Sequence, residues 1–270
     1  MKNNETSTRK AILDIVHRSS ASHIASSFSV VEILSAVYRS LDINKVKKQS
    51  NDRDRVIVSK GHSAAALYTI LFKFGLMSKS DLEKYHTNNS LLSGHASHFI
   101  PYVEHSTGGL GHGLSVAVGI CIGFKSKKFL SSRAYVIVGD GELHEGSNWE
   151  ALMLAGHLKL DNLCVLIDNN TLGGIGKTDE CCSLNPLKEK LNSFGFTAFE
   201  VNGHNEDKIY SIIQQTKNTF RPVGIICKTI KGKGVSFMEN NNVWHYRPPN
   251  REEYERGLGE LMETNDHCKM

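Results

Sequence analysis

The sequence predicts an α/β fold built on a doubly wound, mainly parallel sheet with helices on both faces. Short apolar runs rich in β-branched residues alternate with stretches in which apolar residues recur at helical spacing, as expected of repeated strand and helix units. The runs at residues 134–138 and 163–167 are separated by a helix-compatible stretch, residues 149–157. Because parallel strands need a crossover of about a dozen residues or more, these three pieces predict one central βαβ unit.

The other elements continue this alternation on both sides of the central unit. Near the amino terminus, Ile12, Ile15 and Val16 lie on one helical face, and a polar stretch, residues 19–27, breaks the pattern before a second helix. The predicted helices cover residues 8–20, 29–41, 61–74, 111–124, 149–157, 186–194, 206–215 and 252–263, and the predicted strands cover residues 56–58, 134–138, 163–167, 197–201 and 223–228. Without a linker or an internal repeat, residues 1–270 are expected to form one domain with a polar tail from Asn240.

Two stretches are predicted to be mostly irregular. Residues 78–107 contain four histidines, and residues 171–186 form a polar loop that ends at Pro186. Long loops inside a compact domain are uncommon and are usually functional. We therefore expect the loop of residues 78–107 to contribute to a site.

The composition predicts a soluble, cytoplasmic protein. The 270 residues, 40% of them hydrophobic, can bury a large core, and no apolar run approaches the length that spans a bilayer. The amino terminus is polar and lacks the apolar core of a signal peptide. Six cysteines form no metal-type pair, and three lie in apolar runs, as buried thiols in a reducing compartment do. The formal charge of +4 is small and dispersed, so neither nucleic acid nor membrane is an expected partner.

Polar residues follow both strands of the central unit where each strand ends. Asp140 lies in Gly139-Asp140-Gly141 after the first strand, and Asn170 follows the second. Open α/β sheets bind ligands beyond the carboxyl ends of their strands. A carboxylate, an amide oxygen and the backbone carbonyl of Leu172 suit Mg²⁺, which usually shares its oxygen ligands with a phosphate. Either turn alone could be structural, but both at the ends of one crossover favour a metal and diphosphate site.

Two nucleotide-binding motifs are excluded. Residues 108–113 have a nominal Gly-x-Gly-x-Gly spacing, but no strand precedes them, as a dinucleotide-binding fold requires. Gly176-Lys177-Thr178 imitates the end of a phosphate-binding P-loop, yet Thr171 occupies the position of its first glycine. Neither a Rossmann nor a Walker site is expected.

Several motifs resemble those of one family, the transketolases. Gly139-Asp140-Gly141, followed by Asn170 thirty positions after Asp140, resembles the thiamine diphosphate binding motif. The stretches that resemble transketolase in the same order are residues 54–62 (DRVIVSKGH), 106–113 (STGGLGHG), 139–151 (GDGELHEGSNWEA) and 228–234 (KTIKGKG). The resemblance covers nearly the whole chain but not a whole transketolase. It implies the thiamine diphosphate-binding fold, and within it the diphosphate-binding domain.

The resemblance implies a site for thiamine diphosphate and Mg²⁺. It assigns Asp140, Asn170 and the Leu172 carbonyl to the metal. The residues that it assigns to the cofactor are Lys60, His62, Gly108, Gly109, Leu110, Gly141, Glu145, Asn170, Lys231 and His245. A lysine such as Lys231 suits this place because it supplies a point charge to an anionic ligand.

The resemblance also gathers four catalytic histidines around the reactive carbon of the cofactor, namely His23, His62, His95 and His245. Two-carbon transfer requires hydroxyl protons to be removed and returned, and a neutral imidazole both donates and accepts. Since the chain has 13 histidines, any one taken alone would more often be structural. His62, within Ser-Lys-Gly-His, matches the family best, whereas the glycines that the family typically has beside His23 are serine and alanine here.

Two acidic residues follow the Gly-Asp-Gly motif. Glu145 and Glu150 lie at the start of a predicted helix, where the helix dipole alone would favour either one. The resemblance implies that they lie instead at a dimer interface, in a carboxylate network between two active sites.

The chain departs from the family after Trp244-His245. Tyr246 stands where the family commonly has glycine. Tyr246 is interpreted as narrowing the donor channel or as turning Arg247 toward an anionic group, and a surface loop with extended prolines is an equal alternative.

One half of the family's active site has no counterpart in this sequence. In transketolases, thiamine diphosphate binds between two domains, and the second supplies a glutamate that activates the cofactor. We therefore expect the amino-terminal subunit of a split transketolase, which transfers a two-carbon ketol unit between sugar phosphates with a separately encoded carboxy-terminal subunit. An α2β2 heterotetramer in which like subunits pair around a two-fold axis is expected. A subunit of a deoxyxylulose phosphate synthase or of a 2-oxo acid dehydrogenase, and a catalytically silent regulatory subunit, stay open as alternatives.

Overall fold

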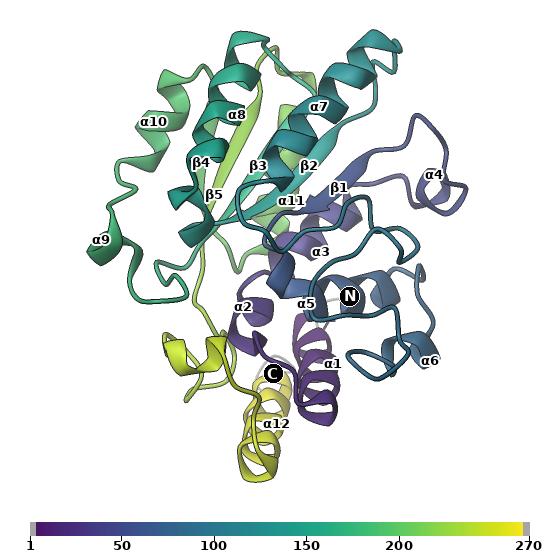
Figure 1. Ribbon diagram of the computed structural model, residues 1–270, viewed down its shortest axis with the longest axis vertical. Coiled ribbons are helices and arrows are strands. Elements are labelled where there is room, and N and C mark those ends of the chain that lie inside the picture. Colours follow the sequence, from purple (N-terminus) through teal and green to yellow (C-terminus); the bar gives the residue numbers. More distant parts are fainter. Residues whose placement is uncertain (1–3, 267–270) are drawn as a thin grey trace.

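Residues 4–266 are described by the computed structural model, and within them five strands form one sheet (Figure 1). The strands are β1 (Arg55–Val58), β2 (Ala134–Gly139), β3 (Leu163–Asn169), β4 (Thr197–Asn202) and β5 (Val223–Lys228). Their order is β1-β2-β3-β5-β4, and each neighbouring pair is parallel. The prediction of a doubly wound parallel sheet is confirmed.

The central strands are buried on both faces, which explains their continuous apolar sequence. Along β2, Tyr135 and Ile137 belong to one hydrophobic core, whereas Val136 and Val138 belong to another on the opposite face. Helices α7 (Gly113–Ser126), α8 (Gly146–His157) and α10 (Leu187–Ser193) cover the face of Val136, while α3 (Val31–Arg39) and α11 (Glu206–Gln215) lie behind the sheet (Figure 1).

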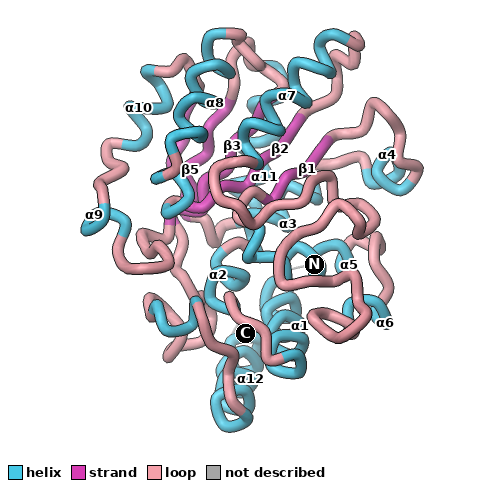
Figure 2. Tube along the Cα trace, in the orientation of Figure 1, coloured by secondary structure: helices cyan, strands magenta, loops and turns pink. Residues whose placement is uncertain are grey.

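The amino-terminal helices extend the core behind the sheet. The structure also contains α1 (Asn4–Ser19), α2 (Ile24–Ser29), α4 (Ile43–Lys47), α5 (Ala64–Lys73), α6 (Lys79–Leu82), α9 (Thr178–Cys181), α12 (Arg251–Asp266) and the short 3-10 helices η1 (Gly61–Ser63), η2 (Gly141–His144), η3 (Thr216–Asn218) and η4 (Asn242–His245). The long loop between α6 and α7 folds over α5 (Figure 2), where the Tyr68 hydroxyl donates to the His95 carbonyl at 2.9 Å.

Three predicted segments need correction. The polar stretch of residues 19–27 is only partly a break, because its second half begins α2, whose residues are all buried although three of them are serines. The loop of residues 171–186 contains α9. The segment after Asn240 does not behave as a polar tail: Leu261 is 2% exposed, and the Tyr254 hydroxyl donates to Asp14 of α1 at 2.8 Å. A narrow apolar face is sufficient to dock α12 on α1.

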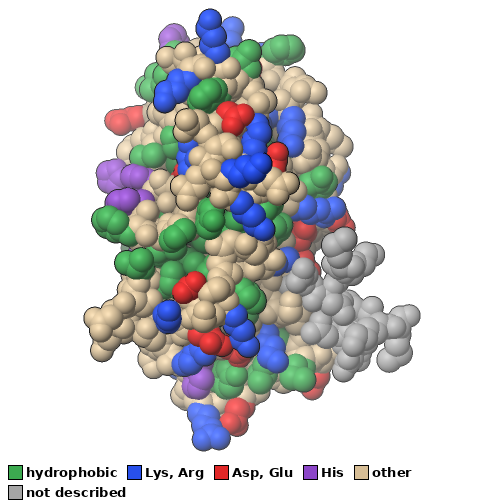
Figure 3. All heavy atoms as spheres, turned by 90° about the vertical axis from the view of Figure 1, so that its right-hand side faces the viewer, with side chains coloured by type: hydrophobic (Ala, Val, Ile, Leu, Met, Phe, Trp, Pro, Cys, Tyr) green, Lys and Arg blue, Asp and Glu red, His purple; other side chains and the backbone are tan. Residues whose placement is uncertain are grey.

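The surface carries mixed charge. On the face shown in Figure 3, Lys and Arg side chains lie interspersed with Asp, Glu and apolar side chains. Within residues 4–266, no helix combines the length and the apolar character needed to cross a bilayer.

Candidate active site

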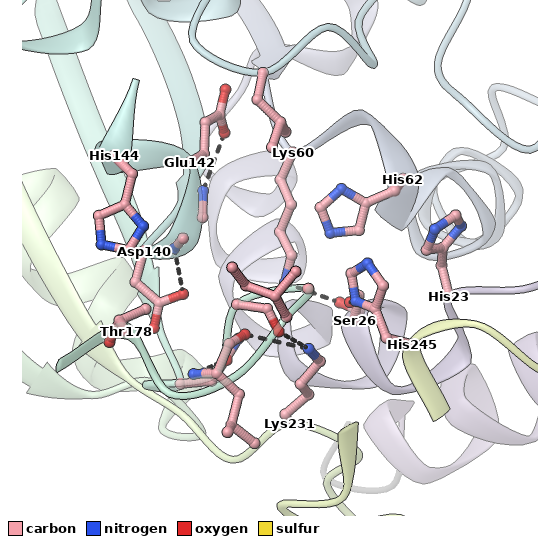
Figure 4. Close-up of a pocket in the computed structure, with 18 of the residues that line it drawn as sticks. His23, Ser26, Lys60, His62, Asp140, Glu142, His144, Thr178, Lys231 and His245 are labelled. Carbon is pink, nitrogen blue, oxygen red and sulfur yellow. Dashed lines mark hydrogen bonds between the residues drawn. The ribbon is translucent and has the colours of Figure 1, made fainter. Parts of the chain in front are cut away.

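A cavity of ≈ 500 Å³ lies at the carboxyl ends of four strands. Lys60 follows β1, Asp140 follows β2, Asn170 follows β3 and Lys231 follows β5, and all four line the cavity. This is the position at which an open α/β sheet is expected to bind its ligand. Figure 4 shows Asp140 on one side of the cavity and His23, His62 and His245 on the other, with both lysines reaching between them.

The acidic side, defined by Asp140, Asn170 and Leu172, centres on a carboxylate that is 2% exposed. Asp140 Oδ1 accepts a hydrogen bond of 2.7 Å from the Gly141 amide, and Oδ2 accepts one of 2.5 Å from the Thr171 amide. Burial and the nearby Asp168 raise the pKa of Asp140 to about 6. A bound cation would favour the ionised form of such a carboxyl group.

Asn170 and Leu172 add two oxygen atoms to this side. Asn170 Oδ1 accepts from the Leu172 amide at 3.1 Å, and Asn170 Nδ2 donates to Asp168 at 3.2 Å. The Leu172 carbonyl accepts a hydrogen bond of 3.1 Å from Lys231 Nζ. Burial and the nearby Lys60 lower the pKa of Lys231 to about 8. The three predicted metal ligands therefore lie together, with an amine beside them.

Lys60 lines the cavity, but its ammonium group is engaged with the protein. It forms an ion pair with Asp168, and both side chains are almost fully buried. Lys60 Nζ also donates to Ser29 Oγ at 3.2 Å and to the Ser26 carbonyl at 3.3 Å. Although burial raises the pKa of Asp168, Lys60 and the hydroxyl of Thr229 lower it more, and the net shift is downward. This buried pair links the ends of β1 and β3.

The histidine group consists of His23, His62, His95 and His245, and four distant segments of the chain bring it together. The ring centre of His23 lies 5.2 Å from that of His62, 5.6 Å from that of His95 and 4.9 Å from that of His245. The rings of His62 and His245 are 5.3 Å apart. His23 is therefore the centre of the group.

Local contacts hold His23 in this central place. Its φ of 69° is in the left-handed region, which costs energy for a residue other than glycine and persists where the surroundings impose it. The His23 amide donates to the His245 carbonyl at 3.1 Å, and Ser22 Oγ lies 2.9 Å from His23 Nδ1. Serine before His23 thus contacts the ring, and its presence does not displace the histidine from the cavity.

The surroundings of the histidine group lower the pKa of all four rings and so favour their neutral form. Burial, followed by the nearby His95 and Lys231, lowers the pKa of His23 to about 4. Burial and Lys231 lower the pKa of His245 to about 3, and burial and Lys60 lower that of His62 well below its usual value. Burial also lowers the pKa of His95. Neutral rings can act as donors and as acceptors.

Most other predicted site residues also face the cavity. Those that line it are Gly108, Leu110, Gly141 and Glu145. A side chain at Gly108, which has φ +144°, would approach the His95 ring to 3.0 Å, so only glycine fits there. Gly109 and Glu150 are exposed and lie outside the lining residues.

The sequence interpretation missed Glu142. This residue is 2% exposed, accepts a hydrogen bond from the Gly111 amide at 3.0 Å and another from the Gly139 amide at 3.2 Å, and also contacts Ser59. Glu142 therefore fixes the motif after β2 to the loop before α7. Its place inside the Gly-Asp-Gly-Glu motif was the only available signal. The sequence interpretation also missed three polar lining residues, Ser26, His144 and Thr178. Tyr246, interpreted as narrowing the donor channel, does line the cavity.

The residues of the acidic side fit a magnesium diphosphate. A carboxylate, an amide and a carbonyl are the oxygen ligands that Mg²⁺ prefers, and phosphate oxygens complete such sites. A Cβ on Gly141 would lie 3.1 Å from Gly173 Cα, so bare backbone lines the space beside Asp140. Within the described residues, no three His, Cys, Asp or Glu side chains gather in a way that could hold a metal alone.

Comparison with known proteins identifies the family. The family model for "Transketolase, thiamine diphosphate binding domain" matches residues 2–257. The chain is 39% identical over 259 residues to one of the subunits of the apulose-4-phosphate transketolase of Phocaeicola vulgatus, covering 94% of this chain and 91% of that protein. It is 34% identical to the 6-deoxy-6-sulfo-D-fructose transketolase subunit SqwG of a Clostridium species, covering 94% and 93%.

A solved structure agrees with these sequence relatives. The transketolase of Campylobacter jejuni superimposes with a TM-score of 0.86 at 27% identity, covering 96% of this chain and 42% of that chain. The chain thus spans less than half of that transketolase but most of the relative from Phocaeicola vulgatus. The resemblance drawn from Asp140 and Asn170 is confirmed, and the chain belongs to the transketolase thiamine diphosphate binding domain family.

Proposed function

We propose that this chain is the amino-terminal subunit of a split transketolase, which transfers a two-carbon ketol unit from a ketose phosphate to an aldose phosphate. One observation carries the proposal: a single cavity pairs an oxygen-ligand set suited to Mg²⁺ with a group of neutral histidines. Bound thiamine diphosphate supplies the carbanion chemistry, and the protein positions and protonates.

The acidic side would anchor the cofactor. Asp140, Asn170 and the Leu172 carbonyl would hold Mg²⁺, and a cation beside Asp140 offsets the burial that raises its pKa. Lys231 would face the diphosphate, where its ammonium balances negative charge. The backbone at Gly108, Leu110 and Gly141 would line the cofactor.

The histidine group would handle the hydroxyl protons of the sugars. A ring with a pKa far below neutral carries one donor and one acceptor nitrogen, so it can hold a hydroxyl group without electrostatic repulsion from Lys60 and Lys231. His23, which lies near the other three rings, would pass protons within the group. Proton transfer by positioned side chains contributes about 10²–10⁴-fold to rate.

The assembly would be an α2β2 heterotetramer with a separately encoded carboxy-terminal subunit. Both sequence relatives are named as subunits of a transketolase, which supports a separate partner for this chain. Helix α8 begins directly after Glu145 and exposes Met153 (58%) and Leu154 (44%), and Leu158 (42%) is exposed just after its last residue. Exposed apolar side chains beside Glu145 and Glu150 suit pairing of like subunits there.

The substrates would be sugar phosphates or their anionic analogues. The names of two relatives specify apulose-4-phosphate and 6-deoxy-6-sulfo-D-fructose, so both belong in the substrate panel beside a common pentulose phosphate. We further propose that the enzyme works in the cytoplasm, where the buried free thiols of Cys121, Cys164 and Cys227 stay reduced.

The test measures two-carbon transfer with thiamine diphosphate and Mg²⁺, first with this chain alone and then with a separately encoded carboxy-terminal transketolase subunit. We expect activity only in the mixture. Asp140→Ala should weaken Mg²⁺-dependent cofactor binding at least about 100-fold and abolish transfer, since it removes a metal ligand. Asp207→Ala, which removes an exposed carboxylate on α11, is the matched control and should retain both.

Three results would favour other functions. Activity of the isolated chain would contradict the split active site. Turnover of pyruvate with a triose phosphate, or with an electron acceptor, would indicate a deoxyxylulose phosphate synthase or a 2-oxo acid dehydrogenase. Absence of Mg²⁺-dependent cofactor binding in the mixture would indicate a silent regulatory subunit.

A further inference from the structure

A histidine outside the cavity connects the buried core to the cofactor side. His204 follows the edge strand β4, and its side chain is 13% exposed. His204 Nδ1 lies 3.0 Å from Glu32 Oε2, and His204 Nε2 accepts a hydrogen bond of 2.8 Å from the Ile230 amide. The paired register of β4 and β5, which sets Asn202 opposite Lys228, brings His204 and Ile230 together.

The two partners of His204 define its tautomer. A backbone N–H can only donate, so the nitrogen facing Ile230, which is Nε2, must be unprotonated. An ionised carboxylate can only accept, so the nitrogen facing Glu32, which is Nδ1, must carry the proton. Although burial raises it, Arg9 and then His204 lower the pKa of Glu32 to about 2, so the carboxylate is ionised. The ring is therefore neutral, with its proton on Nδ1.

The carboxylate behind His204 is itself held firmly. Arg9 Nη1 and Nη2 donate to the two oxygens of Glu32 at 2.7 and 2.8 Å, and Nη2 also donates to the Phe28 carbonyl at 3.0 Å. The side chains of Arg9 and Glu32 are 7% and 6% exposed. A bidentate pair of this kind has one geometry, so it sets the orientation of the His204 ring.

The amide in front of His204 belongs to the residue before Lys231. Lys231 Nζ donates to the carbonyls of Leu172 and Gly173, both at 3.1 Å, and to Asn242 Oδ1 at 2.8 Å. The place and direction of the Lys231 backbone therefore decide whether its ammonium group reaches the acidic side. Fixing the Ile230 amide fixes the direction in which the chain enters Lys231.

We propose that His204 is a positioning residue that acts through the Ile230 amide to aim Lys231 at the diphosphate of the cofactor. The inference rests on the proposed role of Lys231 and adds the element that places it. No contact between His204 and the cavity is involved, because His204 is absent from the residues that line it.

Two substitutions separate the two contacts of the ring. In His204→Gln, the longer side chain carries its carbonyl oxygen near the position of Nε2. It can still accept a hydrogen bond from the Ile230 amide, but it loses the contact with the Glu32 carboxylate. In His204→Asn, the shorter side chain carries its amide nitrogen near the position of Nδ1. It can still donate a hydrogen bond to the Glu32 carboxylate, but it loses the hydrogen bond from the Ile230 amide. Both remove the ring and both are neutral, so packing loss is similar.

The first readout is hydrogen exchange of a peptide that spans residues 229–233 in the cofactor-free chain. His204→Asn should accelerate exchange of the Ile230 amide about tenfold, since a hydrogen bond is lost, and His204→Gln should stay within about twofold of the unmodified chain. The second readout is the dissociation constant for thiamine diphosphate with Mg²⁺ in the two-subunit complex, which should rise about tenfold in His204→Asn only.

The outcomes are distinct. Equal effects of both variants on exchange, or no effect of His204→Asn, would overturn the positioning role. Faster exchange in His204→Asn with unchanged cofactor affinity would support the contact of His204 with the Ile230 amide but overturn its role in aiming Lys231 at the diphosphate. Nitrogen NMR of the unmodified chain is independent of folding of the variants: a proton on Nε2 of His204 at neutral pH would contradict the proposal.

Discussion

The two sides of the cavity differ in which segments of the chain form them and in the direction in which the pKa values of their side chains are shifted. The acidic side comes from one βαβ unit, because Asp140 and Asn170 follow β2 and β3, which are neighbours in sequence and in space. The histidine group comes from four segments spread from His23 to His245. The acidic side holds a carboxylate whose pKa is raised, whereas the histidine group holds rings whose pKa values are lowered.

This difference shows how one protein environment prepares two kinds of chemistry. Burial disfavours charge on both sides. The ionised form of Asp140 therefore requires a nearby cation, and the histidines favour their neutral form. Lys60 and Lys231 reach between the two sides, and their positive charge adds to burial in keeping the rings neutral. The lysines therefore serve both sides at once.

The largest expected effect comes from breaking the buried pair that both sides share. Lys60→Met leaves Asp168 ionised and unpaired in the core, and we expect the free energy of unfolding of the cofactor-free chain to fall by about 3–5 kcal/mol. Urea denaturation measures it. Lys228→Met, which breaks an exposed pair with Glu200, is the matched control and should cost less than about 1 kcal/mol.

The double variant Lys60→Met/Asp168→Leu sharpens this test. Because it removes both charges, it should recover much of the stability lost in Lys60→Met. A double variant as unstable as the single one would mean that the hydrogen bonds of Ser29 and Thr229 to Asp168, rather than the lysine, hold this region together.

The next effect concerns the histidine group and pH. The pKa values of His23 and His245 are about 4 and about 3 in the folded chain, below the ordinary value of about 6.5. Between these values the unfolded chain binds protons at these two histidines that the folded chain does not, so their contribution to the free energy of unfolding should fall as pH falls from about 6.5 toward 4, against a smaller opposite contribution from Asp140. Urea denaturation of the cofactor-free chain at several pH values checks this sign.

Substitution of the two rings tests the origin of that dependence. His23→Gln/His245→Gln should flatten the fall in stability over this pH window, while the control His98→Gln removes an exposed imidazole elsewhere. An unchanged slope in the double variant would show that the acid sensitivity comes from other groups.

The sequence could predict the acidic side from physical rules and the histidine group only from resemblance. Short apolar strands and the residues that follow them placed Asp140 and Asn170 correctly, because neighbouring parallel strands end at one edge of the sheet. No rule joins His23, His95 and His245 across the chain, since long-range contacts carry no local pattern. Glu142 was missed for a related reason: a glutamate near a helix start is usually exposed, and only the fold buries this one.

The smallest expected effect concerns Tyr246, which stands where the family commonly has glycine and which lines the cavity. Its hydroxyl donates to the Gly174 carbonyl at 2.9 Å, beside the Asn242 amide that donates to the same oxygen at 2.8 Å. Arg247 pairs with Glu253 and lies over the Trp244 ring, so its expected turn toward an anion in the cavity is not seen.

Tyr246→Phe removes one of the two hydrogen bonds to the Gly174 carbonyl and should speed hydrogen exchange of residues 172–176 about fivefold, equal to about 1 kcal/mol. Tyr210→Phe, on α11 and outside the cavity lining, controls for loss of a hydroxyl. Unchanged exchange in Tyr246→Phe would mean that Asn242 and Lys231 alone hold the loop, and that the ring of Tyr246 acts only as a wall of the cavity.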